Sequence, residues 1–242
     1  MPIRKVLFMG GVVSNGLLNN LVAYWPQNEV AGNALELHNG VTLTDVNTVT
    51  SAAGLVYPLA RQYTRATNEY HTETGSAVVK PSADFTFAAW VNPDTVGDQM
   101  RFAHFFGAGG DAFLIDYNAF AANRLTFYVT NTLAAANQVA SNAFGPLVAG
   151  NWHCVICWIA GAEIGIEVNG VSNVAVMAGT VRVATEPSVL RIGSTPARAW
   201  NGRIGPSALW KSAAGLGGAL DAEHRAAWYN GGAGLRYDQL NF

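Results

Sequence analysis

Short apolar segments of strand length, separated by turn residues, recur along most of this chain. The clearest covers residues 85–91 and stops at the turn sequence Asn92-Pro93-Asp94. Each segment has about the usual strand length of 5 to 6 residues or slightly more, and a series of short strands with turn signals is typical of all-β sandwiches. The pattern predicts an antiparallel two-sheet sandwich. The other segments cover residues 101–107, 111–117, 124–130, 151–159, 164–168, 171–177, 189–193 and 203–210.

One turn fixes the pairing of two of these segments. Residues 168–171 read Val-Asn-Gly-Val, and Asn-Gly between β-branched residues is a strong hairpin signal because both central positions need positive φ. We therefore expect segments 164–168 and 171–177 to pair directly.

Segment 151–159 is apolar on both faces and contains the only cysteines, Cys154 and Cys157. A strand that is apolar on both faces is expected in a sheet whose two sides are covered. In a strand the two Cα atoms are about 10 Å apart and the side chains point to opposite faces, which is too far for a disulfide. Both cysteines are expected to be free, buried thiols.

Only one helix is expected, close to the C-terminus. Asp221 can cap residues 222–229, Leu220 can pack against the first turn, and Asn230-Gly231-Gly232 provides the stop.

Composition excludes several classes of function. The 242 residues carry a net charge of −2, and charged residues make up only 12%, so the clustered cations of a nucleic-acid-binding surface are missing. No apolar run reaches the ~18 residues of a membrane span, and 50% hydrophobic residues argue against disorder. We expect neither nucleic acid nor a membrane as a partner.

The residues of hydrolytic enzymes do not assemble in this sequence. Glu163 and Glu167 share one strand face but are about 13 Å apart, whereas retaining glycosidases need two carboxyl groups about 5 to 5.5 Å apart. Gly165, which lies between them, carries no carboxyl group. The five histidines are scattered and no Gly-x-Ser-x-Gly elbow is present. We expect no enzymatic activity and no catalytic residue.

Calcium is the one cofactor left open, and otherwise none is expected. The available oxygen ligands are Asp94, Asp98, Asp111 and Asp116, and a calcium site needs several of them on one loop system. Nothing in their spacing shows convergence, so no metal-binding residue is assigned.

A set of motifs, in order along residues 21–232, resembles the laminin-G-like jelly roll of the concanavalin A-like lectin and glucanase superfamily. Each motif is weak alone, but the ordered set is specific for the fold. It implies a jelly-roll domain over residues 21–242, preceded by an arm over residues 1–20. The motifs are residues 21–26 (LVAYWP), 60–70 (ARQYTRATNEY), 84–93 (DFTFAAWVNP), 150–153 (GNWH), 167–170 (EVNG), 190–193 (LRIG), 201–205 (NGRIG), 208–210 (ALW) and 228–232 (WYNGG).

Stand-alone domains of this kind, with a segment similar to residues 229–235 (YNGGAGL), resemble virion proteins of tailed bacteriophages. The resemblance implies a non-enzymatic capsid decoration or accessory protein with glycan-binding capacity. Its partners would be the capsid shell, other virion proteins and further copies of itself, and it would reside in virions assembled in the host cytoplasm. The alternative is an extracellular, soluble carbohydrate-binding lectin, since this fold carries many functions.

Two sets of residues are candidates for contacts. The arm contains an apolar cluster outside the resembling domain, Val6, Leu7, Phe8, Val12 and Val13, and it is expected to dock on another protein chain. Trp200 and Tyr117 lie next to turn residues, which marks them as loop aromatics. Packing is the favoured role of each, and contact with a ligand or partner is the alternative.

Overall fold

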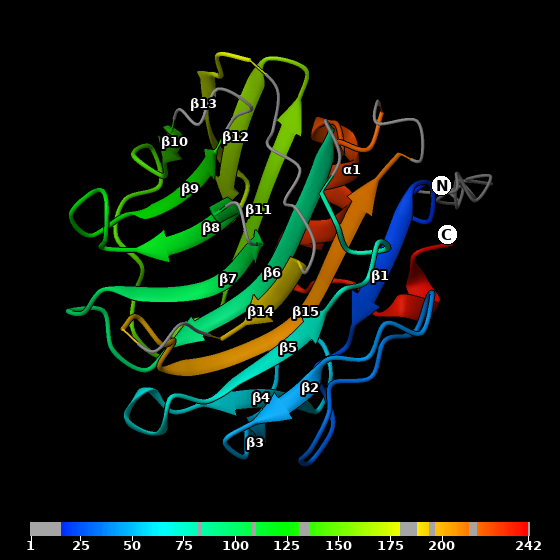
Figure 1. Ribbon diagram of the computed structural model, residues 1–242, viewed down its shortest axis with the longest axis vertical. Helices are drawn as coiled ribbons and strands as arrows, with labels where there is room; N and C mark the ends of the chain where they lie inside the picture. The colour runs from blue at the N-terminus through cyan, green and yellow to red at the C-terminus, as the bar shows by residue number, and fades with distance from the viewer. Residues whose placement is uncertain are drawn as a thin grey trace, which may run out of the picture.

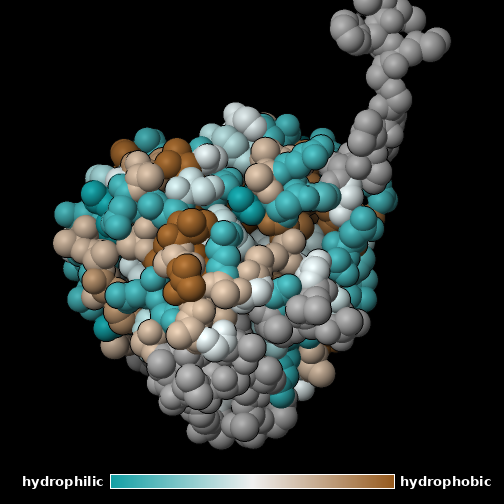
Figure 2. Space-filling model, turned by 90° about the horizontal axis from the view of Figure 1, so that it is seen from above, coloured by the Kyte–Doolittle hydropathy of each residue, from teal (hydrophilic) through white to brown (hydrophobic). Residues whose placement is uncertain are grey.

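The computed structural model describes residues 16–81, 84–107, 110–130, 136–179, 188–193, 197–212 and 217–241. Two antiparallel sheets face each other as a jelly-roll sandwich (Figure 1), which confirms the predicted fold class. None of the helices in these ranges is long and apolar enough to cross a membrane. Seen from above, this face of the molecule mixes hydrophilic and weakly apolar side chains, with one strongly hydrophobic cluster near its middle (Figure 2).

The larger sheet has eight strands and the smaller has seven. The strands of the larger sheet are, in spatial order, β13 (Val171–Val176), β12 (Glu163–Val168), β11 (His153–Ala160), β6 (Phe85–Pro93), β15 (Gly202–Lys211), β4 (Leu59–Tyr63) and β3 (Thr50–Ala53), with β1 (Leu21–Trp25) also paired to β15. The strands of the smaller sheet are β10 (Ala136–Ala140), β9 (Leu125–Thr130), β8 (Gly110–Tyr117), β7 (Met100–Gly107), β14 (Ser188–Ile192), β5 (Tyr70–Thr74) and β2 (Thr44–Val46).

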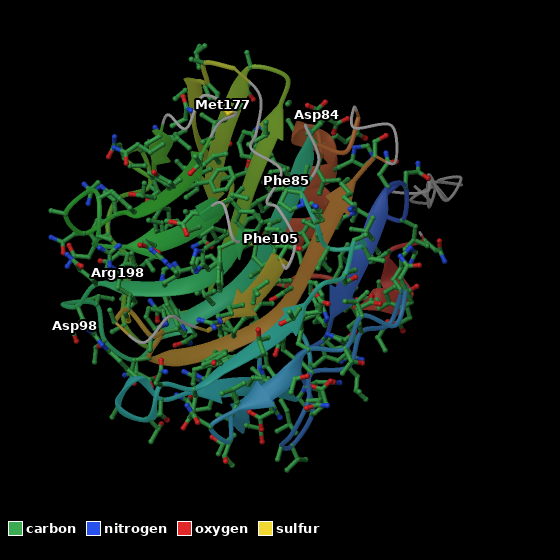
Figure 3. All side chains as sticks on the ribbon, in the orientation of Figure 1. Asp84, Phe85, Asp98, Phe105, Met177 and Arg198 are labelled. Carbon is green, nitrogen blue, oxygen red and sulfur yellow. The ribbon has the colours of Figure 1, made fainter. Side chains whose placement is uncertain are left out.

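An apolar core fills the space between the sheets. Phe85 and Phe87 of β6 point across to Phe113 of β8, with ring centroids 5.3 and 5.9 Å apart. Figure 3 shows Phe85 and Phe105 between the two layers. The alternation of inward and outward residues seen in the sequence therefore continues through the packed structure.

A second apolar layer covers the outer face of the larger sheet. It is formed by α1 (Ala222–Tyr229) and neighbouring segments, which pack on outward residues of that sheet such as Trp90 and Trp158. Figure 1 shows α1 lying against β6, β11 and β15. This layer explains why segment 151–159 is apolar on both faces, and it leaves the smaller sheet as the one whose outer face α1 does not cover.

The local signals in the sequence are confirmed. Asn169 and Gly170 join β12 to β13 with φ of 49° and 82°. The Asp221 side chain accepts from the backbone N–H of His224 at 2.9 Å, and α1 ends at Asn230 in the left-handed region. Cys154 packs in the layer under α1 and Cys157 in the core between the sheets, both as free thiols.

A buried polar network ties β4 to β5 inside the sandwich. The Tyr63 hydroxyl bonds His71 Nδ1 at 2.8 Å, and His71 Nε2 donates to the Gly32 carbonyl at 3.1 Å. The Arg61 guanidinium lies 3.2 Å from the same ring. Burial lowers the pKa of His71 to about 4; Arg61 acts in the same direction and the Gly32 hydrogen bond opposes both.

We expect this histidine to make stability depend on pH. Its pKa in the folded state lies below the ordinary value of about 6.5, so the unfolded chain binds the proton more readily. The contribution of neutral His71 is complete above pH 6.5 and is lost as the pH falls from 6.5 to 4, by roughly 3 kcal/mol in total. Urea unfolding across this range, compared with His71→Gln, measures it: an equal slope in both proteins would contradict the assignment.

Candidate functional site

The outer face of the smaller sheet carries a row of side chains that crosses four strands. Strand register places Arg191 of β14 beside His104 of β7, then Leu114 of β8, then Tyr128 of β9. All four point away from the core because neighbouring residues of each strand point into it. The row combines charged, polar, apolar and aromatic groups on one sheet face.

Next to this row, two arginines share one buried carboxylate. Arg101 donates to Asp116 through Nε and through Nη2, the latter at 2.8 Å, and Arg198 Nη1 donates to Asp116 Oδ2 at 2.8 Å. Asp116 is fully buried, whereas the Arg198 side chain is 31% exposed. Arg198 is held in place by its own carbonyl, which accepts from the Arg101 backbone N–H at 2.6 Å. The carboxylate thus fixes a guanidinium whose outer edge reaches solvent.

A second carboxylate of β8, Asp111, lies on the same face of the smaller sheet. His104 Nε2 donates to Asp111 Oδ1 at 2.8 Å. This hydrogen bond lowers the pKa of Asp111, and burial lowers the pKa of His104. At neutral pH the pair is therefore a carboxylate beside a neutral imidazole, and the half-exposed Asp111 remains an acceptor.

Two aromatic rings complete the site. Phe120, in the loop after β8, stacks on Tyr128 with centroids 5.2 Å apart and planes 16° apart, and 41% of Phe120 is exposed. The Arg198 guanidinium lies 5.7 Å from the Phe120 ring. Together these groups border the sheet-face hollow, a cavity of about 440 Å³ lined by Arg101, Asp111, Leu114, Phe120, Tyr128, Ala197 and Arg198.

The hollow offers flat aromatic surface, an apolar floor, guanidinium donors and a carboxylate acceptor. Ligand sites are typically concave surfaces with aromatic walls and a few placed polar groups, and aromatic rings combine a large apolar face with defined geometry. A ligand with both apolar faces and hydroxyl groups matches this combination.

The aromatic residues singled out from the sequence lie elsewhere. Tyr117 and Trp200 have no exposed surface and pack in the core, Trp200 with its ring 5.7 Å from Phe102. Both are packing residues, the role favoured from the sequence, and neither offers surface to a ligand. Tyr117 is the last residue of β8, and Trp200 lies just before β15. The arm residues Val6, Leu7, Phe8, Val12 and Val13 lie outside the described residues.

The four candidate calcium ligands are paired separately. Asp94 accepts from Gln62 Nε2 at 2.9 Å, and Asp98 lies 3.1 Å from Arg65 Nη1. Asp111 and Asp116 take the partners described above. Within the described residues, no three histidine, cysteine, aspartate or glutamate side chains are placed to hold a metal ion.

The carboxylates of β12 have structural partners on the outer face of the larger sheet. Glu163 accepts from Trp158 Nε1 at 2.8 Å, and Glu167 accepts from Ser172 at 2.7 Å and from Arg225 at 3.1 Å. Neither lines the sheet-face hollow. These contacts give both glutamates structural roles in the larger sheet and its covering layer.

Comparison with known proteins gives the fold its relatives. Domain 4 of AbnA, an extracellular arabinanase from Geobacillus stearothermophilus solved with arabinotriose, matches with a TM-score of 0.64 and 14% identity, covering 86% of this chain and 97% of that domain. The binding domain of Paraclostridial Mosquitocidal Protein 1 matches with a TM-score of 0.64 and 11% identity. The match covers 88% of this chain and 52% of that domain. Trypanosoma rangeli sialidase, solved with sialic acid, matches with a TM-score of 0.58 and 13% identity. The match covers 90% of this chain and 34% of the sialidase.

These identities show a shared fold alone. The chain spans about half of the toxin binding domain and a third of the sialidase. No curated protein sequence matches it.

A match to a family model identifies the family of this chain. The model described as the concanavalin A-like lectin/glucanases superfamily, of laminin-G type, matches residues 66–215, which is more than half of the 242 residues. This segment contains most strands of both sheets, including β7, β8 and β9 of the sheet-face hollow. The chain therefore belongs to the laminin-G-like group of the concanavalin A-like lectin/glucanase superfamily.

Proposed function

We propose that this protein is a non-catalytic carbohydrate-binding domain and that the sheet-face hollow is its sugar site. The observation that carries the proposal is that the stacked Phe120–Tyr128 pair lines the same hollow as the partly exposed Arg198 and the carboxylate of Asp111. The apolar face of a sugar ring would stack on the aromatic pair. Its hydroxyl groups would accept from Arg198 and donate to Asp111.

The two carboxylates at the hollow, Asp111 and Asp116, support sugar binding rather than sugar hydrolysis. A glycosidase needs a carboxylic acid that stays protonated near neutral pH, which requires a raised pKa. The pKa of Asp111 is lowered by its hydrogen bond to His104. Both oxygens of Asp116 are occupied by Arg101 and Arg198, so no free proton donor faces the hollow from these two residues.

The structural relatives support a sugar ligand. The arabinanase domain was solved with arabinotriose and the sialidase with sialic acid, and other similar structures are toxin binding domains. Arabino-oligosaccharides are therefore the first probes to use, followed by galactan and β-glucan fragments.

The test is titration calorimetry of the purified chain with this panel. We expect at least one sugar to bind and Tyr128→Ala to weaken it tenfold or more, because loss of a stacking ring removes about 1.4 kcal/mol or more. Tyr128→Phe keeps the ring and is the matched control, expected to stay within about threefold. Circular dichroism verifies that both variants are folded.

Three results would contradict the proposal. The first is that no sugar in the panel binds, and the second is that Tyr128→Ala binds as well as the original chain. The third is hydrolysis of the bound sugar, measured as new reducing ends, which is lost when Asp111 is replaced by asparagine.

The narrower hypothesis of a phage capsid decoration protein stays a prediction. The described residues contribute one compatible feature: β13 is an edge strand of the larger sheet, and its Val174 and Val176 are 57% and 86% exposed. Exposed apolar edge strands are surfaces that other chains can cover. Copurification of the native chain with virus particles would support this role, and recovery as a free lectin would favour the alternative.

A further inference from the structure

A second cavity adjoins the sheet-face hollow at the end of the smaller sheet. This end hollow measures about 450 Å³, close to the 440 Å³ of its neighbour. Ala197 borders both cavities, so the two are neighbours that meet at this small side chain. The end hollow is lined by Arg65, Ala66, Thr95, Asp98, Ala197 and Asn201.

The boundary between the two cavities has a fixed position. Residues 197–199 run beside the start of β7, where Arg101 donates its backbone N–H to Arg198 and forms a bridge with Ala199. Arg198 points into the sheet-face hollow and bonds Asp116. Figure 3 shows Arg198 and Asp98, which borders the end hollow, at the same end of the molecule.

The end hollow is lined by groups that bind hydroxyls. Arg65 Nη1 lies 3.1 Å from Asp98 Oδ2, and the Asp98 side chain is 63% exposed. Asn201 uses its Oδ1 to accept from the Arg65 backbone at 3.3 Å. None of the lining residues is aromatic, so a sugar here would be held by hydrogen bonds while the stacking contact stays in the sheet-face hollow.

We infer that the two cavities are successive subsites of one groove and that the ligand is a linear oligosaccharide several units long. This inference rests on the proposed sugar-binding function. One part of the chain would stack on Tyr128 and the next part would cross Ala197 to reach Arg65 and Asp98. Affinity would then rise with chain length until both cavities are filled.

The experiment compares arabinose, arabinotriose and arabinohexaose by titration calorimetry. The key variant carries Arg65→Ala and Asp98→Ala together, which removes both charges of an exposed pair and leaves neither unpartnered. We expect the original chain to bind arabinohexaose at least tenfold more tightly than arabinose, and the double variant to lose most of this gain while binding arabinose unchanged. Arg203→Ala, on the outer face of the larger sheet, is the control and should keep the full gain.

A second variant tests the junction itself. Ala197→Trp places a large side chain between the cavities and should also abolish the gain from chain length. The inference is overturned if arabinose and arabinohexaose bind equally well to the original chain, or if the gain survives in both variants. Absence of binding by all three sugars, or indifference to Tyr128→Ala, would overturn the proposed function together with this inference, whereas a length-independent but Tyr128-dependent affinity overturns the second subsite alone.

Discussion

Replacing Asp116 by alanine is expected to lower the free energy of unfolding by about 3 to 5 kcal/mol, the usual cost of removing one partner of a buried ion pair. Asp116 is fully buried and is the carboxylate that both Arg101 and Arg198 contact. Arg101 is itself almost completely buried, so without Asp116 its charge would stay in the protein with no carboxylate in contact.

Urea denaturation measures this effect, with the midpoint and slope fitted separately. Asp98→Ala is the matched control because it also removes an aspartate from an arginine pair, but an exposed one. Exposed pairs contribute about 0 to 1 kcal/mol, so the control should change little. If the two variants lost equal amounts of unfolding free energy, burial would not be the reason that the Asp116 network stabilises the protein.

The same network connects stability with the site. Asp116 holds Arg198 at the edge of the sheet-face hollow, so its loss removes the fixed donor as well as the buried pair. A folded Asp116→Asn variant would therefore bind sugars more weakly even where its stability is only partly reduced.

Much of the fold is predictable from the sequence because its signals are local. Alternating apolar residues mark β6 and β9, Asn169-Gly170 marks the β12–β13 hairpin, and Asp221 marks the start of α1. Periodicity does not mark β1, β2, β3, β4, β5 or β10. The family resemblance covers β1 and β4, and nothing in the sequence marks the other four. They are short strands at or near sheet edges, and half-exposed residues give them little apolar pattern.

The site could not be predicted in the same way because it depends on strand register. Tyr128 lines up with Leu114 and His104 only because β9 pairs with β8 and β8 pairs with β7. Arg198 joins them from a segment far along the chain. Tyr117 shows the converse error: it follows Phe113 and Ile115 at steps of two residues, a spacing that marks it as inward. Its neighbour Asn118 suggested a loop, but the inward position determines its burial.

Gly165 is the residue for which sequence and structure give the most different explanations. The sequence presents it as a missing catalytic carboxylate, whereas in the structure it makes room for Trp158 on the neighbouring strand. A Cβ atom at position 165 would lie 2.1 Å from the Trp158 ring. That ring is fixed by a 2.8 Å hydrogen bond to Glu163 and by the Arg225 guanidinium 3.8 Å from a ring centroid.

We therefore expect Gly165→Ala to lower the free energy of unfolding by about 3 kcal/mol, at the upper end for overpacked cores. The ring cannot give way without losing its contacts to Glu163 and Arg225. Gly97→Ala is the control, because no atom lies within 4 Å of the Cβ added there.

A double-mutant cycle isolates the cause, since contacting residues show non-additive effects. If the Trp158 ring is what excludes a side chain at position 165, Gly165→Ala should cost little more in a Trp158→Ala background, measured again by urea denaturation. A full loss in that background would show that the backbone of β12, and not the ring, requires glycine. An aspartate at position 165 meets the same ring, so a glucanase-like carboxylate at this position would require Trp158 to leave its place under Arg225.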